Sequence, residues 1–134
     1  MFKVISETLV WWPVLFPGVT EDGKVIENKI EMRFVILDED AIDDFTRATA
    51  IIVGAPVDED AGAADVDRTP SILMQRALEP IVRDWRLVAA ANGEPLAFNP
   101  DNFRALLRVP NVFREILGAY AACRAGRAET RKGN

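Results

Sequence analysis

Few residues of this chain could carry out catalytic chemistry. The sequence has no histidine, so it lacks the commonest general acid and base, the base of serine and cysteine nucleophile systems, and an imidazole ligand for zinc. Its single cysteine, Cys123, falls on the apolar face of a predicted helix, where burial is favoured over a reactive thiol. Neither glycine-rich phosphate-binding motif is present. We therefore predict no catalytic residue, no cofactor site and no enzymatic activity.

Acidic residues are the remaining candidates for a metal site. Asp58, Asp60 and Gly62 resemble part of a calcium-binding loop, but the glycine and glutamate that such a loop needs at its sixth and twelfth positions are Ala63 and Thr69 here. Paired catalytic carboxylates would have to share a cleft, and sequence spacing alone shows no cleft among the 21 acidic residues. We predict no metal site, and we interpret residues 54–68 as a flexible acidic loop.

The net charge of −5 is distributed unevenly along the chain. Residues 38–67 contain ten acidic side chains and one basic one, whereas the last 31 residues contain seven basic and two acidic side chains. An acidic domain whose basic residues are confined to a tail argues against nucleic-acid binding, which needs a concentrated basic face. Arg124, Arg127 and Arg131 form a basic stripe if the last helix extends that far, either as a solvated helix end or as a docking surface.

The elements that must position these residues begin with a predicted β-hairpin. Residues 8–16 are rich in β-branched and aromatic side chains, residues 28–37 alternate between apolar and polar, and turn-forming glycines lie between them. In the first strand, alternation places Trp11 on one face and Trp12 on the other, so both faces are apolar. Pro13 indicates a strand at a sheet edge or at a bulge. The candidate partner-binding residues are therefore Trp11, Trp12, Val14, Phe16, Arg124, Arg127 and Arg131.

Helices are predicted after the hairpin. The first begins after the N-cap residue Asp38 and ends at Gly54, and a second begins at Pro70, with a kink or split at Pro80. The stripe of the second helix is predicted to extend to Trp85, and two more helices follow residues 99 and 111. The predicted fold class is α+β: an N-terminal antiparallel β-hairpin or small sheet followed by a helical bundle of about four helices, in one domain over residues 1–126 with a basic tail over residues 127–134.

No apolar stretch is long enough to cross a membrane, since the longest run, residues 9–16, contains Pro13. The first residues also lack the basic, apolar and small-residue order of a signal peptide, and one cysteine gives no support for an oxidising compartment. We expect a cytoplasmic location.

The whole pattern resembles a known family. It comprises Trp12-Pro13-Val14, the run Met32-Arg33-Phe34-Val35-Ile36-Leu37, then Ile81-Val82, Trp85, Val88, Gly93-Glu94-Pro95-Leu96, Phe98, Asn99, Leu106-Leu107, Pro110 and Tyr120. In these residues the chain, from about Thr8 to Gly126, resembles the small tail assembly chaperones of long-tailed bacteriophages and prophages. The acidic segment from Gly54 to Asp67 has no counterpart in that resemblance.

The resemblance implies a non-enzymatic role in tail morphogenesis. Such proteins are thought to coat the long, aggregation-prone tape measure protein before tail-tube subunits assemble around it, and then to leave. The implied partners are the tape measure protein and possibly the tail tube protein, in the host cytoplasm and not in the mature virion. The two apolar faces of the first strand also suggest a homo-oligomer. The alternative is a small acidic regulatory or inhibitory protein that sequesters a single folded partner by charge mimicry.

Overall fold

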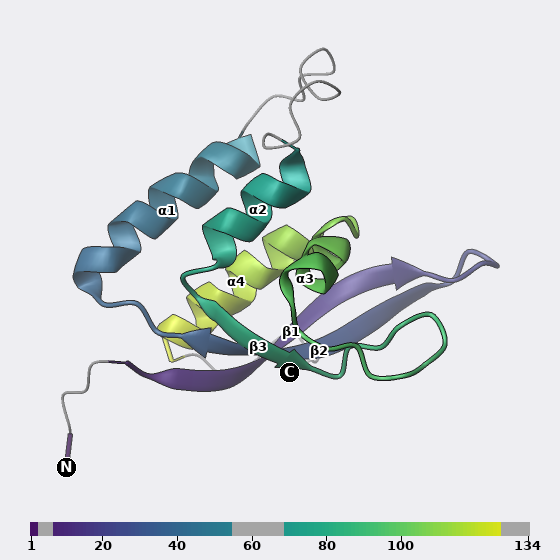
Figure 1. Ribbon diagram of the computed structural model, residues 1–134, viewed down its shortest axis with the longest axis horizontal. Coiled ribbons are helices and arrows are strands. Elements are labelled where there is room, and N and C mark those ends of the chain that lie inside the picture. The colour runs from purple at the N-terminus through teal and green to yellow at the C-terminus, as the bar shows by residue number, and fades with distance from the viewer. Residues whose placement is uncertain (3–6, 55–68, 127–134) are drawn as a thin grey trace.

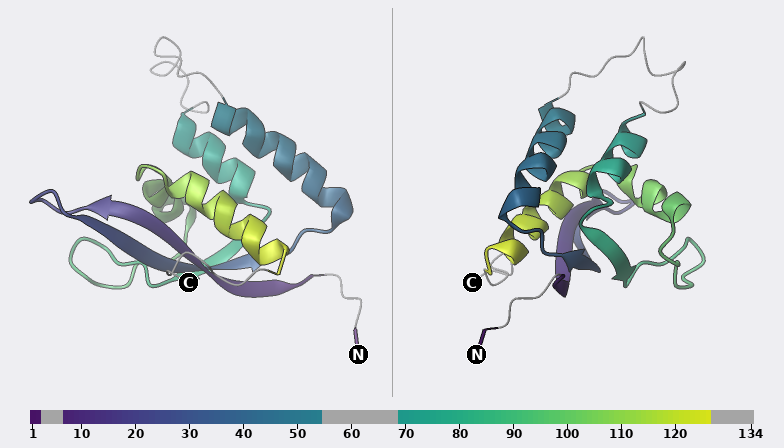
Figure 2. Two further views of the ribbon diagram at one scale, coloured as in Figure 1. Left: turned by 180° about the vertical axis from the view of Figure 1, so that it is seen from behind. Right: turned by 60° about the vertical axis from the view of Figure 1, so that its left-hand side comes forward.

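A three-stranded antiparallel sheet in the order β1-β2-β3 forms one layer of the molecule. The computed structural model describes residues 1, 2, 7–54 and 69–126. Their elements are β1 (Leu9–Val19), β2 (Val25–Val35), α1 (Glu39–Gly54), α2 (Pro70–Leu78), β3 (Val82–Arg86), α3 (Pro100–Leu107) and α4 (Val112–Arg124). Four helices cover one face of the sheet (Figures 1 and 2). The fold is α+β, as predicted, with one strand more than the hairpin.

The hairpin is longer than its sequence pattern predicts. Both strands have 11 residues, and only residues 20–24 connect them. The Thr20 hydroxyl donates to Asp22 Oδ1 at 2.8 Å and accepts from the Lys24 N–H at 3.0 Å, while Gly23 supplies the left-handed φ of 85° that the turn requires. The predicted ten-residue connection therefore contains the ends of both strands.

Pro13 fits its strand because β1 is an edge of the sheet, as predicted. The Ile36 N–H donates to the Thr8 carbonyl at 3.0 Å, and hydrogen-bonded pairs alternate along an antiparallel ladder. Even-numbered residues of β1 are thus bonded to β2, and the odd-numbered ones have their backbone groups directed away from it. The missing N–H of Pro13 falls at one of these outward positions and costs no ladder bond.

The core lies between the sheet and the helices. The inward residues of β1 and β2 pair across the hairpin as Trp12 with Met32 and Val14 with Ile30. Helix α4 packs on β1 and covers this face. The largest fully buried side chains come from all layers: Tyr120, Phe34, Leu15, Met32, Leu78, Ile81, Ile116, Val14 and Val112. Leu15 belongs to the outward set of β1 and is nevertheless buried, with 2% of its surface exposed.

Helix α1 begins where its sequence predicts. Asp38 Oδ1 accepts from the N–H groups of Asp40 and Ala41 at 3.0 and 2.8 Å, so it caps the first turn. Phe45 and Thr49 are buried along the predicted stripe. The predicted pairing of Arg47 with the carboxylate four residues before it is wrong, because Arg47 lies 3.7 Å from Asp44 instead.

The prediction for residues 79–86 is wrong in its secondary structure. Helix α2 stops at Leu78, two residues before Pro80, and the chain then forms β3, in which Met32 of β2 pairs with Trp85. A proline ring cannot continue the helix, and β2 offers a free edge on which residues 82–86 complete the sheet. Trp85 therefore reaches the core from a strand, where its Nε1–H donates to the Leu96 carbonyl at 2.7 Å.

The remaining elements begin and end close to their predicted positions. A turn at residues 90–94 with Gly93 at a φ of 85° returns the chain towards β3. The Asn99 side chain caps α3 by accepting from the Asn102 N–H at 2.8 Å. Phe103 of α3 packs edge-on against Trp85, with ring centroids 6.2 Å apart. Asn111 then adopts a left-handed φ of 71° and starts α4.

Candidate protein-binding surface

The seven predicted partner-binding residues lie in three places. Val14 and Phe16 are core residues with 0% and 7% of their surface exposed, and Trp12 packs against the same core. Their side chains belong to the inner face of the sheet and are not available on the surface of the folded chain. Arg127 and Arg131 lie outside the described residues, as does the predicted acidic loop apart from Gly54. Only Trp11 and Arg124 remain as candidates.

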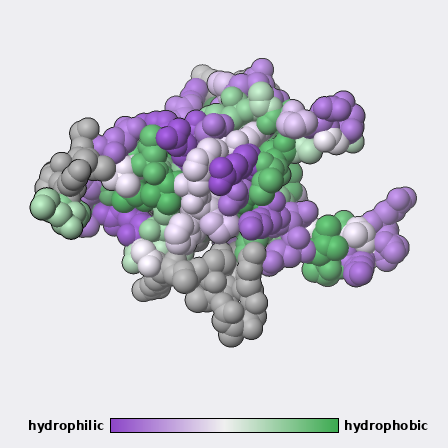
Figure 3. Space-filling model, turned by 90° about the horizontal axis from the view of Figure 1, so that it is seen from below, coloured by the Kyte–Doolittle hydropathy of each residue, from purple (hydrophilic) through white to green (hydrophobic). Residues whose placement is uncertain are grey.

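Trp11 lies on the outer face of the sheet, opposite the helices. The guanidinium carbon of Arg86 sits 4.2 Å from the centroid of its ring, and Arg86 Nε donates to Glu31 Oε1 at 2.6 Å. This contact is a cation–π interaction held by an ion pair. Seen from below, polar residues separate the apolar areas of this side of the molecule (Figure 3). Trp11 is thus occupied within its own sheet, which lessens its value as a partner anchor.

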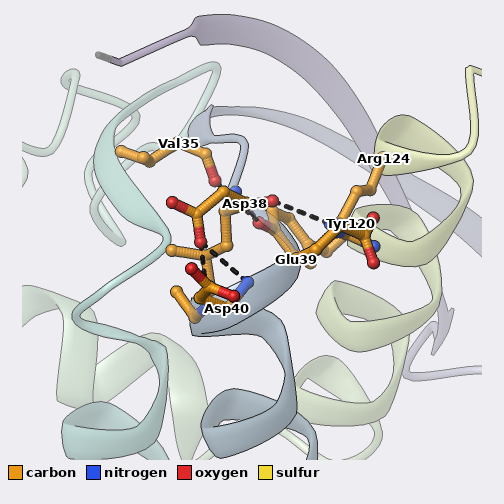
Figure 4. A network of polar contacts seen from close by, with 8 residues as sticks. Val35, Asp38, Glu39, Asp40, Tyr120 and Arg124 are labelled. Atoms are coloured by element: carbon orange, nitrogen blue, oxygen red, sulfur yellow. Dashed lines mark hydrogen bonds and ion pairs between the residues drawn. The ribbon is translucent and has the colours of Figure 1, made fainter.

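Arg124 joins α4 to the link between β2 and α1. Its Nε donates to the Leu37 carbonyl at 2.9 Å, and its Nη2 lies 3.0 Å from Glu39 Oε1 (Figure 4). The side chain of Arg124 is mostly buried, at 24% exposure. It has a structural role that the sequence pattern does not predict.

Tyr120 forms a second bond between the same segments. Its hydroxyl accepts from the Leu37 N–H at 2.9 Å and donates to the Val35 carbonyl at 2.8 Å. Its ring also meets Phe34 and Phe45 edge-on, with centroids 5.2 and 5.4 Å away. The tyrosine therefore satisfies two backbone groups where β2 ends.

A groove of about 370 Å³ opens beside this network, between α1 and α4. Apolar side chains, with Tyr120 among them, form most of its lining. The lining residues are Ile42, Phe45, Thr46, Thr49, Leu117, Tyr120, Ala121, Arg124 and Ala125.

A second hollow of about 450 Å³ continues along the same two helices. Ile52 and Val53 line it from the next turn of α1, and Phe113 and Arg114 line it from the preceding turn of α4. Helix α1 packs chiefly on α2, and α4 packs chiefly on β1, so the two helices face each other across this space (Figure 2). We call the combined groove the α1–α4 trough. From Ile42 to Val53 it extends over about 16 Å, or three helical turns.

The walls of the trough suit the approach of another helix. On α4, Arg114, Gly118, Ala121 and Ala125 follow one another at helical spacing, and a Cβ at Gly118 would meet nothing within 4 Å. Small side chains allow close approach, and the half-buried Leu117 supplies apolar contact. Sequence reasoning missed this surface because each helix contributes only half of it. The one available signal was the run of small residues beside the α4 stripe.

The Gly118→Ala variant is expected to raise the free energy of unfolding by about 0.5–1 kcal/mol, since glycine in a helix interior costs about that much relative to alanine. Urea denaturation measures the change. Gly23→Ala serves as the control: its φ of 85° strains any side chain, so it is expected to destabilise the protein by about 1 kcal/mol. A loss of stability in Gly118→Ala would contradict the open space above α4.

Stability is expected to fall in alkali. Burial raises the pKa of the Tyr120 phenol and the pKa of the Cys123 thiol. Because both groups hold their protons more tightly in the folded chain, their contribution is complete below the unfolded pKa values, about 8.5 and 10, and is lost as the pH rises through the folded ones. Urea denaturation at pH 7.5, 9 and 10 measures this. The Cys123→Ala variant is expected to lose less stability between pH 7.5 and 9, and an equal loss in both proteins would contradict the thiol's part.

The described residues show no other obvious site. Among them, no helix combines the length and apolar character needed to cross a membrane. The same residues contain no cluster of three or more acidic, cysteine or histidine side chains placed to hold a metal ion. Comparisons with protein-family models, with curated proteins and with solved structures find no match to this chain.

Proposed function

We propose that this protein is a tail assembly chaperone of a long-tailed bacteriophage or prophage, which binds the tape measure protein and keeps it soluble in the host cytoplasm. The observation that supports this proposal is the α1–α4 trough, an apolar groove about three turns long with small residues on one wall. Grooves of this kind bind amphipathic helices through apolar side chains spaced three and four residues apart. A long helical client such as a tape measure protein offers many such stretches.

The proposal assigns no catalysis to the chain. Binding a helix needs contact area and complementary charge, and no bond is made or broken. The tail tube protein and a second copy of the chain are further proposed partners. They would use other surfaces, because the proposed client occupies the trough.

Co-expression with a long, coiled-coil-rich tape-measure-like protein from the same locus tests the function. We expect the client to move from the insoluble to the soluble fraction and to co-purify with the chain. The proposal is abandoned if the purified chain neither binds nor solubilises that client.

A deletion separates this function from charge mimicry. Removing residues 56–67 takes away five acidic residues and is expected to leave client binding largely unchanged. Complete loss of binding on this deletion would favour the acidic regulator.

A further inference from the structure

We infer that the α1–α4 trough imposes one direction on its client: the bound helix lies parallel to α1, with its N-terminus over the start of α1. This inference rests on the proposed function and adds the orientation and the charge order of the client segment. It is carried by the charges at the two ends of the trough, which differ in sign.

The end of the trough near the start of α1 is acidic. Glu39, Asp40, Asp43 and Asp44 lie in the first turns of this helix. Glu39 is paired with Arg124 and Asp44 with Arg47. Asp40 and Asp43, both exposed, form no ion pair within the described part of the chain. Two carboxylates are therefore free to attract a positive charge on a bound segment.

The opposite end is basic. Arg108 and Arg114 both line the 450 Å³ hollow and are exposed, and neither forms an ion pair among the residues that the structure describes. The first turn of α4 also opens there, and the side chain of its N-cap residue, Asn111, makes no capping bond. Its backbone N–H groups add positive potential to that of the arginines.

These two ends distinguish between the directions of a bound helix. A helix has a partial positive charge at its N-terminus and a partial negative charge at its C-terminus. Placed parallel to α1, it brings its positive end to Asp40 and Asp43 and its negative end to Arg108 and Arg114. Placed the other way, both ends meet like charge. The preferred client segment is therefore amphipathic, about 11 residues long over the trough, basic in its first turn and acidic in its last.

Two synthetic peptides test the inference. Both carry the same apolar stripe at positions three and four residues apart. One has lysines in its first turn and glutamates in its last, and the other has the reverse order. Fluorescence anisotropy with the full chain is expected to show about tenfold tighter binding of the first peptide.

A charge-reversed protein removes the effect of intrinsic helix stability, which differs between the peptides because lysine at an N-terminus opposes the helix dipole. In the variant Asp40→Lys, Asp43→Lys, Arg108→Glu, Arg114→Glu, the preference is expected to change towards the reversed peptide. The ratio of the two preferences cancels the peptide term. The variant lacking residues 56–67 is expected to keep the native preference, since no residue of that segment enters the argument.

Direction is read by a nitroxide label on the N-terminus of the first peptide. Its paramagnetic effect is expected to broaden the amide signal of Ile42 and to spare that of Val53. Broadening at Val53 alone, or equally at both residues, overturns the orientation, as does an unchanged preference in the charge-reversed protein.

Failure of the inference and failure of the proposed function give different results. If the tape measure protein is solubilised but charge reversal has no effect on peptide preference, only the orientation is wrong. If neither peptide binds while the client is still solubilised, the client uses another surface. A dimer of the chain that either peptide dissociates would assign the trough to a second copy and overturn the inference.

Discussion

Replacing Tyr120 by phenylalanine is expected to lower the free energy of unfolding by about 2 kcal/mol, although the ring and its edge-on contacts are kept. The hydroxyl satisfies both the Leu37 N–H and the Val35 carbonyl. Without it, two backbone groups at the end of β2 lose a partner, and a buried group left unsatisfied costs about 1–3 kcal/mol. Chemical denaturation of both proteins at pH 7 measures the difference.

Thr49→Val is the matched control for the loss of a buried hydroxyl. The Thr49 hydroxyl donates to the carbonyls of Phe45 and Thr46 within its own helix, and it joins no two elements. Its loss is expected to cost less than about 1 kcal/mol. Equal effects of the two substitutions would contradict the role of Tyr120 in linking β2 to α4.

Introducing a charge into the trough by Ala121→Glu is expected to weaken client binding at least tenfold without unfolding the protein. Ala121 is exposed and lines the groove beside Leu117 and Tyr120. A glutamate there fills the space that a client helix needs and would bury an unpaired charge under it. Co-purification of the tape measure protein and anisotropy with the peptides both measure the loss.

Ala105→Glu provides the comparison, because Ala105 is an exposed alanine of helix α3 that lines neither hollow. We expect native client binding from this variant, and circular dichroism of both variants to match that of the native chain. If Ala121→Glu binds the client as tightly as Ala105→Glu does, the trough is not the binding site.

Local signals in the sequence predicted much of this fold. The alternation in residues 28–37, the Asp38 cap and the Asn99-Pro100 helix start each depend on neighbouring residues, and each forms as predicted. Strand β3 depends on a partner far away in the chain. Its Trp85 lies at helical spacing from Leu78 and Ile81, and all three reach the core, so the apolar pattern alone could not tell a strand from a helix here.

The candidate site was largely beyond sequence reasoning for a similar reason. Alternation correctly separated Trp11 from Trp12, but it could not tell which face the helices would cover. The covered face proved to be the one with Val14 and Phe16. The trough is formed by two helices more than 50 residues apart in the sequence, and a groove between such helices leaves no contiguous motif. Arg124 was noticed as part of a basic stripe, whereas its bonds are to the backbone of Leu37 and to Glu39.

The position of α4 over β1 also determines when the fold can close. The hairpin leaves the ribosome first, and the helix that covers its apolar face is among the last segments to be made. Throughout synthesis, the side chains of Val14 and Phe16 therefore lack their cover, and exposed apolar strands are the species most prone to aggregate. Until residue 124 has been synthesised, the nascent chain has the same solubility problem that we propose the finished protein solves for its client.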